Sequence, residues 1–193
     1  MTEEVSFEET LRVAERVVEV LARRHVDAVV IGAMALAVHH YPRDTQDFDL
    51  AVAMPPSDLE ALAATFRGLG WEVEVRTPDA SDPLGGVLDI NAPGADLVQV
   101  INFDNPPSGG FPGLVRAAAE KAQPLAAGSP VKVADLPALI AFKLYAGGSK
   151  SKLDILELLD RNQPVDIEEL GTRCAALGLR KKLERLLAFR QEE

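Results

Sequence analysis

Two acidic residues, Asp47 and Asp49, stand two positions apart in a segment that alternates acidic and apolar residues. This alternation predicts a β-strand, on which side chains two positions apart leave the same face. Two carboxylates held so close repel each other unless a cation lies between them. Mg²⁺ prefers oxygen ligands and commonly combines one or two carboxylates with phosphate oxygens. The pair therefore predicts a site for Mg²⁺ or Mn²⁺, and the alternative is a strand edge that faces water.

Gly32 is the next residue with a chemical use. It follows a β-branched run over residues 27–31 and precedes small residues over 33–40, which predicts a buried strand and then a helix. Backbone N–H groups at the start of a helix attract anions, and a glycine there lets a phosphate approach closely. Arg43 and Thr45 lie between this helix and the acidic strand. They are candidates for contact with phosphate oxygens, and the alternative is loop surface.

The order and spacing of these residues resemble the nucleotidyltransferase superfamily, and within it the abortive-infection AbiEii-like and related bacterial nucleotidyltransferases. Those proteins carry a strand ending in Gly-Gly or Gly-Ser, a helix, and then Arg-x-Thr-x-Asp-hydrophobic-Asp. The matching positions in this chain are Gly32, Ala35, Arg43, Thr45, Asp47 and Asp49. Ala33 stands at the second position of the glycine motif, where it lacks the hydroxyl of the Gly-Ser members. The resemblance implies that Gly32, Ala33, Arg43 and Thr45 bind the nucleotide.

A second segment, residues 139–154, supports the same resemblance. It looks like the helix-borne Leu-x-x-x-Lys-Leu-x-Ala-Gly-x-x-Lys-Asp-x-x-Asp segment of these proteins, although Gly148 and Ser151 stand where an arginine and an aspartate are common. The resemblance makes Lys143 and Lys150 candidates for phosphate contact, and Asp154 a candidate for orienting a lysine.

The family transfers a nucleoside monophosphate from an NTP to an acceptor, using two metal ions held by three carboxylates. One ion would activate the attacking oxygen and the other would carry the triphosphate. The third family acid falls at Gln99, and an amide is a poor substitute for a carboxylate.

A hairpin between the strands over 87–91 and 97–103 suggests a replacement for that acid. If its turn is centred near Gly94, Asp89 lies opposite Gln99 on the same face. Asp89 is therefore the candidate third carboxylate and general base, and the alternative is an ordinary polar strand residue. Asp96 is less favoured because its parity places it on the opposite face from Gln99, and a slip of one residue would exchange these roles.

The surrounding pattern predicts the elements that must position these residues. Helices are expected over 7–24, 33–40, 57–68, 113–120, 135–146, 150–161, 166–177 and 179–190. Strands are expected over 27–31, 47–53, 71–75, 87–91 and 97–103, with an edge strand around 131–133. Ser6, Asp135 and Asp166 are expected N-caps, and the loop over 76–86 is long enough to suggest a functional role.

This element order has too few βαβ alternations for a doubly wound parallel sheet. The predicted fold class is α/β (α+β), a nucleotidyltransferase-like mixed β-sheet flanked by helices with a C-terminal helical part. Residues 1–110 are expected to form the core, and residues 111–193 a mainly helical part packed on it.

Composition limits the partners. The formal net charge of −10 repels nucleic acid and anionic membranes, and so argues against tRNA as an acceptor. No stretch approaches the roughly 18 apolar residues of a membrane span. The acidic start of the chain lacks the features of a signal peptide. Cys174 is the one cysteine and is expected to be a buried apolar residue. These features predict a cytoplasmic protein.

Three functional hypotheses follow. The first is an active nucleotidyltransferase that uses an NTP and modifies a small molecule, a protein or tRNA, as a resistance enzyme or a toxin would. The second is a degraded relative that acts as a nucleotide-binding or interaction module. The third is a phosphatase-like Asp-x-Asp enzyme, which would require a doubly wound sheet around its acids. An antitoxin or a second copy of the chain is a further candidate partner.

Overall fold

The computed structural model describes residues 6–43, 47–79 and 82–192. Its helices are α1 (Phe7–Arg23), α2 (Gly32–Val38), α3 (Leu59–Arg67), α4 (Pro112–Lys121), α5 (Leu136–Ala146), α6 (Gly148–Arg161), α7 (Ile167–Ala176) and α8 (Arg180–Glu192). Its strands are β1 (Ala28–Val30), β2 (Asp47–Val52), β3 (Glu72–Arg76), β4 (Val87–Asn91), β5 (Leu97–Asn102), β6 (Gln123–Pro124) and β7 (Lys132–Val133). Short 3₁₀ turns, Pro56–Asp58 and Pro106–Ser108, precede α3 and α4.

The strands form one mixed sheet in the order β3-β4-β5-β2-β1-β7-β6. The pairs β2–β5 and β1–β7 are parallel, and the remaining pairs are antiparallel. This arrangement confirms the predicted fold class, a mixed β-sheet flanked by helices. In the part of the chain beyond residue 110, β6 and β7 extend the same sheet.

The predicted edge strand around 131–133 was wrong in its position within the sheet. Strand β7 lies between β1 and β6, and β6 forms the edge. Pro124 in β6 has no N–H to donate, which restricts such a strand to an edge of the sheet. A proline also argues against a strand in the sequence, so β6 was not predicted. The pairing of two residues on each side is too short to produce an alternating pattern in the sequence.

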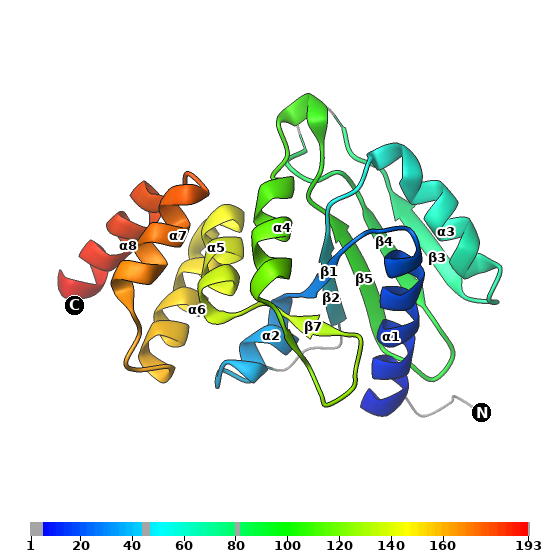
Figure 1. Ribbon diagram of the computed structural model, residues 1–193, viewed down its shortest axis with the longest axis horizontal. Helices are drawn as coiled ribbons and strands as arrows, with labels where there is room; N and C mark the ends of the chain where they lie inside the picture. Colours follow the sequence, from blue (N-terminus) through cyan, green and yellow to red (C-terminus); the bar gives the residue numbers. More distant parts are fainter. Residues whose placement is uncertain (1–5, 44–46, 80–81, 193) are drawn as a thin grey trace.

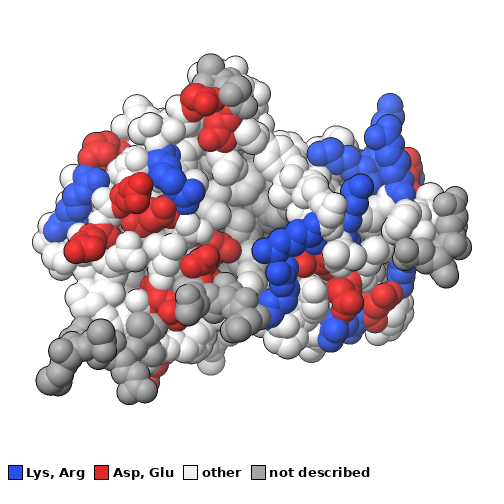
Figure 2. All heavy atoms as spheres, turned by 180° about the vertical axis from the view of Figure 1, so that it is seen from behind, with Lys and Arg blue, Asp and Glu red and all other residues white. Residues whose placement is uncertain are grey.

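The two faces of the sheet differ in character. Phe48, Leu50, Val98, Val100 and Ile90 lie on one face and are fully or almost fully buried. Figure 1 shows α1, α3 and α4 in front of this side of the sheet. The opposite face carries the polar residues of β2, β4 and β5 and is seen from behind in Figure 2. Burial of the apolar face fixes the register, because a slip of one residue would expose it.

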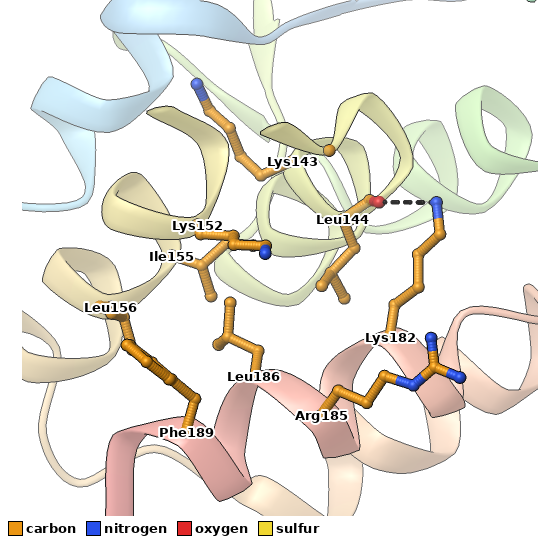
Figure 3. Close-up of a pocket in the computed structure, with 10 residues that line it drawn as sticks. Lys143, Leu144, Lys152, Ile155, Leu156, Lys182, Arg185, Leu186 and Phe189 are labelled. Carbon is orange, nitrogen blue, oxygen red and sulfur yellow. Dashed lines mark hydrogen bonds between the residues drawn. The ribbon is translucent and has the colours of Figure 1, made fainter. Parts of the chain in front are cut away.

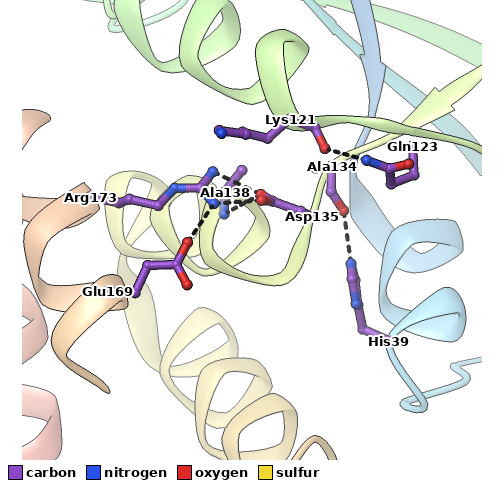
Figure 4. A network of polar contacts seen from close by, with 8 residues as sticks. All are labelled: His39, Lys121, Gln123, Ala134, Asp135, Ala138, Glu169 and Arg173. Atoms are coloured by element: carbon purple, nitrogen blue, oxygen red, sulfur yellow. Dashed lines mark hydrogen bonds and ion pairs between the residues drawn. The ribbon is translucent and has the colours of Figure 1, made fainter. Parts of the chain in front are cut away.

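Helices α5 to α8 lie beside the sheet (Figure 1). Asp135 caps α5 by accepting a hydrogen bond from the Ala138 N–H, and it also pairs with Arg173 of α7. A ring nitrogen of His39, at the end of α2, lies 2.8 Å from the Ala134 carbonyl oxygen (Figure 4). These contacts hold α2, α5 and α7 together around the start of α5.

Several local predictions are confirmed. The side chains of Ser6 and Asp166 accept hydrogen bonds from backbone N–H groups in the first turns of α1 and α7, as N-caps do. Cys174 is fully buried, and its burial raises the pKa of the thiol to about 11. It therefore packs as a small apolar residue.

Within residues 6–43, 47–79 and 82–192, none of the helices combines the length and apolar character needed to cross a bilayer.

Candidate functional site

Strand β2 places Asp47 and Asp49 on the open face of the sheet, as their spacing predicted. In the parallel pairing with β5, Asp47 lies opposite Leu97 and Asp49 lies opposite Gln99. Asp47 is exposed and Asp49 is only partly accessible. Phe48 between them is 2% exposed on the other side. The buried neighbour fixes the strand orientation, so both carboxylates face the same side.

The carboxyl group of Asp49 is in an unusual electrostatic environment. Its pKa is raised to about 6, chiefly by burial and in addition by the Asp47 charge. The Lys143 and Lys150 ammonium groups act in the opposite direction and lower this pKa. A divalent cation between the two carboxylates would favour their ionised forms. The donor set, two oxygen-bearing side chains on one face, fits Mg²⁺ or Mn²⁺ with further oxygens supplied by a phosphate.

Gly32 lies directly against Asp49. Its φ is +66°, a backbone conformation that favours glycine. A Cβ atom at this position would lie 1.8 Å from Oδ2 of Asp49. The chain therefore requires glycine here for two reasons, backbone conformation and contact with a site carboxylate. Ala33 follows in the first turn of α2 and is half-buried.

A buried carboxylate brings two cations to the same region. Asp154 of α6 is 1% exposed. Its two oxygens accept hydrogen bonds from Arg43 Nη1 and Lys143 Nζ, each at 2.7 Å. The lysine that Asp154 was predicted to orient is Lys143. Arg43 precedes β2, while Lys143 and Asp154 belong to α5 and α6, so this triad joins three segments far apart in the sequence.

The other predicted phosphate contacts are placed as follows. Lys150 is exposed in the first turn of α6, and its charge acts on the Asp49 carboxyl group. Thr45 lies outside the described residues. Figure 2 shows side chains of both signs on either side of a hollow, with acidic ones more numerous over the sheet and basic ones more numerous over the helices.

A cavity of about 460 Å³ lies beside Gly32 and Lys143. Phe103, Phe142 and Tyr145 line it, and the ring of Phe103 contacts both of the others, with its centroid 5.1 Å from that of Phe142. The Tyr145 hydroxyl donates a hydrogen bond to the Pro83 carbonyl oxygen at 3.2 Å. Burial raises the pKa of Tyr145, and the Asp82 charge adds to this shift.

These aromatic residues were missed by sequence reasoning. Phe142 and Tyr145 are three positions apart on one helix and flank Lys143. This helical spacing beside a candidate phosphate contact could have indicated them. Phe103 and the loop residues Pro83 and Leu84 come from other segments, and only the tertiary structure brings them to the cavity. The loop over 76–86, expected to be functional, supplies part of this cavity wall.

The hairpin register places Asp89 opposite Gln99, as predicted. Gln99 Nε2 donates to Asp89 Oδ1 at 2.5 Å, and the Arg76 guanidinium pairs with the same carboxylate at 2.8 Å. Gln99 thus lies between Asp89 on β4 and Asp49 on β2. Two strand spacings amount to roughly 10 Å between Asp89 and Asp49.

The described residues contain no group of three or more His, Cys, Asp or Glu residues placed to hold a metal ion. Asp47 and Asp49 thus stay a predicted metal site with two carboxylates, and the role of Asp89 also stays a prediction. Asp96 lies on the other side of the sheet, where its backbone N–H donates to Thr10 Oγ1 of α1 at 2.8 Å.

No family model matches the sequence, and no curated protein shows significant similarity to it. Among solved structures, the chain is similar to an antigenic nucleotidyltransferase-like protein from Paracoccidioides brasiliensis. The two share 19% identity with a TM-score of 0.51, over 95% of this chain and 94% of the other.

Two further structures align with the chain. The antibiotic-resistance factor ANT(2'')-Ia shares 20% identity with a TM-score of 0.46, over 97% of this chain and 94% of that chain. The lincosamide antibiotic adenylyltransferase LnuA shares 12% identity with a TM-score of 0.49, over 82% of this chain and 99% of that chain. At 19% identity, the similarity to the Paracoccidioides protein concerns the fold alone, and function must be argued from the site. The seven-stranded mixed sheet flanked by helices, together with its similarity to the Paracoccidioides protein, shows that the chain has a nucleotidyltransferase-like fold.

Proposed function

We propose that the chain is a metal-dependent nucleotidyltransferase that moves a nucleoside monophosphate from an NTP to an acceptor. The observation that carries this proposal is the pair Asp47 and Asp49 on the open face, with Gly32 packed against Asp49. The cations Lys143 and Lys150 act on the same carboxyl group from α5 and α6. Carboxylates for a metal and cations for a triphosphate are the components that phosphoryl-type transfer requires.

Each residue has a role in this proposal. Asp47 and Asp49 would hold Mg²⁺ or Mn²⁺, which would neutralise phosphate charge and polarise the reacting phosphorus centre. Gly32 and Ala33 allow the phosphates to approach the backbone. Lys143 and Lys150 attract the phosphate oxygens, and Arg43 and Thr45 are candidates for further phosphate contacts.

The aromatic cavity beside Lys143 is proposed to hold the nucleobase. It is lined by Phe103, Phe142 and Tyr145 and has a volume of about 460 Å³, which suits a small organic group. Aromatic side chains provide flat apolar surfaces on which a base can stack.

Asp89 is proposed as the general base for the acceptor. Asp89 lies on the same open face as Asp47 and Asp49. It is separated from Asp49 by Gln99 and does not contact the pair directly. The hydrogen bond from Gln99 Nε2 to Asp89 holds the amide in one orientation, with its carbonyl oxygen directed away from Asp89. A positioned base typically contributes about 10²- to 10⁴-fold to a rate.

The test is incubation with each of the four α-labelled NTPs and Mg²⁺ or Mn²⁺, with small-molecule extracts, protein and tRNA as acceptors. We expect pyrophosphate release and a labelled product, both lost in Asp49→Asn and retained in the control Glu120→Gln. Glu120 is exposed on α4. NTP binding without transfer to any acceptor would favour the alternative, a nucleotide-binding module. Absence of metal-dependent NTP binding would contradict the proposal.

Asp89 is tested separately in the same assay. We expect Asp89→Asn to lower the rate of transfer while NTP binding is retained, because the residue lies away from the metal pair. Transfer at the unchanged rate by Asp89→Asn, with Asp49→Asn inactive, would show that Asp89 has no catalytic part.

The finer relation to the AbiEii-like group is also a proposal, supported by the spacing of Arg43, Thr45, Asp47 and Asp49. It would place the chain among toxins, with an antitoxin as a partner. Co-expression is the measurement: growth arrest by the unaltered chain and normal growth with Asp49→Asn would support it. Normal growth with both forms would count against it.

A further inference from the structure

A second cavity, of about 430 Å³, lies between α5, α6 and α8 (Figure 3). The stem of Lys143 contributes to its wall, but in Figure 3 the ammonium group of Lys143 points away from the other side chains of the pocket. That group binds Asp154 instead. The cavity is therefore separate from the proposed nucleotide site, which lies on the sheet side of α5.

The charged residues that line this pocket are all basic: Lys143, Lys152, Lys182 and Arg185. Acidic residues outnumber basic ones in the chain, 30 to 20, so a pocket lining without Asp or Glu departs from the average surface. Mutual repulsion among cations in a partly enclosed space is relieved by an anion.

The ion pairs along α8 show which of its arginines are free to bind an anion. Arg180 pairs with Glu184 of the same helix, and Arg190 pairs with Asp160 of α6. Arg185, between them, has no hydrogen bond or ion pair with any residue that the structure describes. Lys182 is held in place by a hydrogen bond from its Nζ to the Leu144 carbonyl oxygen at 3.1 Å.

The remaining lining is apolar. Ile155 and Leu186 are 1% and 7% exposed, and Phe189 is 53% exposed. In Figure 3, Leu186 and Ile155 point toward each other between the basic side chains, with Phe189 on one side. A ligand that only satisfied the cations would leave this apolar surface in contact with water. Burying it against an apolar group is favourable by roughly 25 cal/mol per Å².

We propose that this pocket binds a small organic anion, a phosphate or carboxylate attached to a short apolar body. The anionic group lies between Lys152, Lys182 and Arg185, and the apolar body packs against Leu186 and Phe189. The volume falls in the range of small-molecule sites, roughly 300–1,000 Å³.

The experiment is calorimetric titration of the protein, without NTP or metal, using four probes: hexyl phosphate, hexanoate, hexanol and inorganic phosphate. We expect at least one of the two amphipathic anions to bind about tenfold more tightly than both hexanol and inorganic phosphate, because only these probes satisfy both parts of the pocket. Comparison of hexyl phosphate with hexanoate identifies the preferred anionic group. Because no nucleotide is present, the outcome is independent of the proposed transferase activity.

Two variants and a matched control locate the site. Arg185→Glu should weaken binding of the amphipathic anion by about tenfold or more, whereas Lys181→Glu, the same charge reversal on an exposed position of α8, should change it less than about twofold. Phe189→Ser should weaken binding of the amphipathic anion but leave that of inorganic phosphate unchanged. Arg185 is exposed, so its variant is expected to fold, which thermal melts would verify.

Four results would overturn the proposal. The first is that hexanol binds as tightly as the amphipathic anions, and the second is that inorganic phosphate does so. The third is that Lys181→Glu and Arg185→Glu weaken binding equally, and the fourth is that none of the probes binds. A dimer in light scattering that Phe189→Ser converts to monomers would likewise assign this face to a second copy of the chain.

Discussion

The carboxylate of Asp49 is partly buried against Gly32, and its pKa is influenced by the charges of Asp47, Lys143 and Lys150. Its burial raises the pKa to about 6 from an ordinary value near 3.8. Between these two values the folded chain retains a proton that the unfolded chain has released. The stabilisation from this proton is fully present below pH 3.8 and is lost as the pH rises through about 6.

Asp49→Asn should therefore increase the free energy of unfolding at pH 7.5, by on the order of 1–2 kcal/mol, and much less at pH 4. Thermal melts of both proteins across pH 4–8 measure this difference. Glu120→Gln, an exposed substitution, should show no such pH dependence. Adding Mg²⁺ should stabilise the unaltered protein and leave Asp49→Asn unchanged. A variant that is destabilised at pH 7.5 would contradict the explanation of the raised pKa.

Gly32→Ala tests the contact on the other side of the same carboxylate. The new Cβ would meet Asp49 Oδ2, and alanine is strained at φ +66°. We expect a loss of about 1–3 kcal/mol of stability and a weaker affinity for Mg²⁺ with NTP, measured by denaturation and calorimetry. Gly113→Ala is the matched control, because a Cβ there meets no atom within 4 Å. It should be neutral or slightly stabilising. Equal effects of the two substitutions would contradict this account of Gly32.

At the scale of elements, Asp154 joins α6 to α5 and to the segment before β2. It is buried and receives hydrogen bonds from Arg43 and Lys143. Removing one member of a buried charge group leaves the others uncompensated, which is strongly destabilising. The contact therefore holds the helical part in position and directs Lys143 toward the open face.

Asp154→Asn is expected to lower the free energy of unfolding by about 3 kcal/mol and to raise the KM for NTP. Asp160→Asn, on the same helix, is the control. Its pair with Arg190 is solvent-exposed, and such pairs contribute about 0–1 kcal/mol. Denaturation curves and steady-state kinetics provide the two readouts. Equal destabilisation by both variants would show that burial of Asp154 has no special role.

At the scale of the whole molecule, the formal net charge of −10 accompanies an uneven charge distribution. On the face shown in Figure 2, acidic side chains are more numerous over the sheet and basic ones over the helices, although both signs occur in each part. The long-range field of the molecule is negative, while the hollow between the two groups has cations on one wall. A small anion such as an NTP can use these local cations, whereas a long polyanion must also approach the acidic side.

We therefore expect single-stranded RNA and tRNA to bind more weakly than about 100 μM at physiological salt. Fluorescence anisotropy with labelled RNA measures this affinity. Tight, saturable RNA binding that weakens with added salt would contradict this expectation and make RNA the preferred acceptor class.

The local cations are tested by charge reversal. Reversal at Lys143 should weaken NTP binding, and the same change at exposed Lys181 should not.

The sequence by itself determined the local geometry. The period of two in β2 placed Asp47 and Asp49 on one face, and a buried Phe48 between them confirmed the orientation. The turn centred near Gly94 determined the pairing of Asp89 with Gln99. These features depend on residues within a few positions of one another, so spacing and residue type are sufficient to predict them.

Only the tertiary structure decided which distant residues meet. Arg43 and Asp154 are separated by 111 positions, and Arg76 of β3 reaches Asp89 on a neighbouring strand. The aromatic wall near Gly32 and the basic pocket between α5, α6 and α8 also combine separate segments. Periodicity reports which face of an element is buried, but it carries no information about which other element covers that face. That choice is made by packing of the whole chain, which one sequence pattern does not encode.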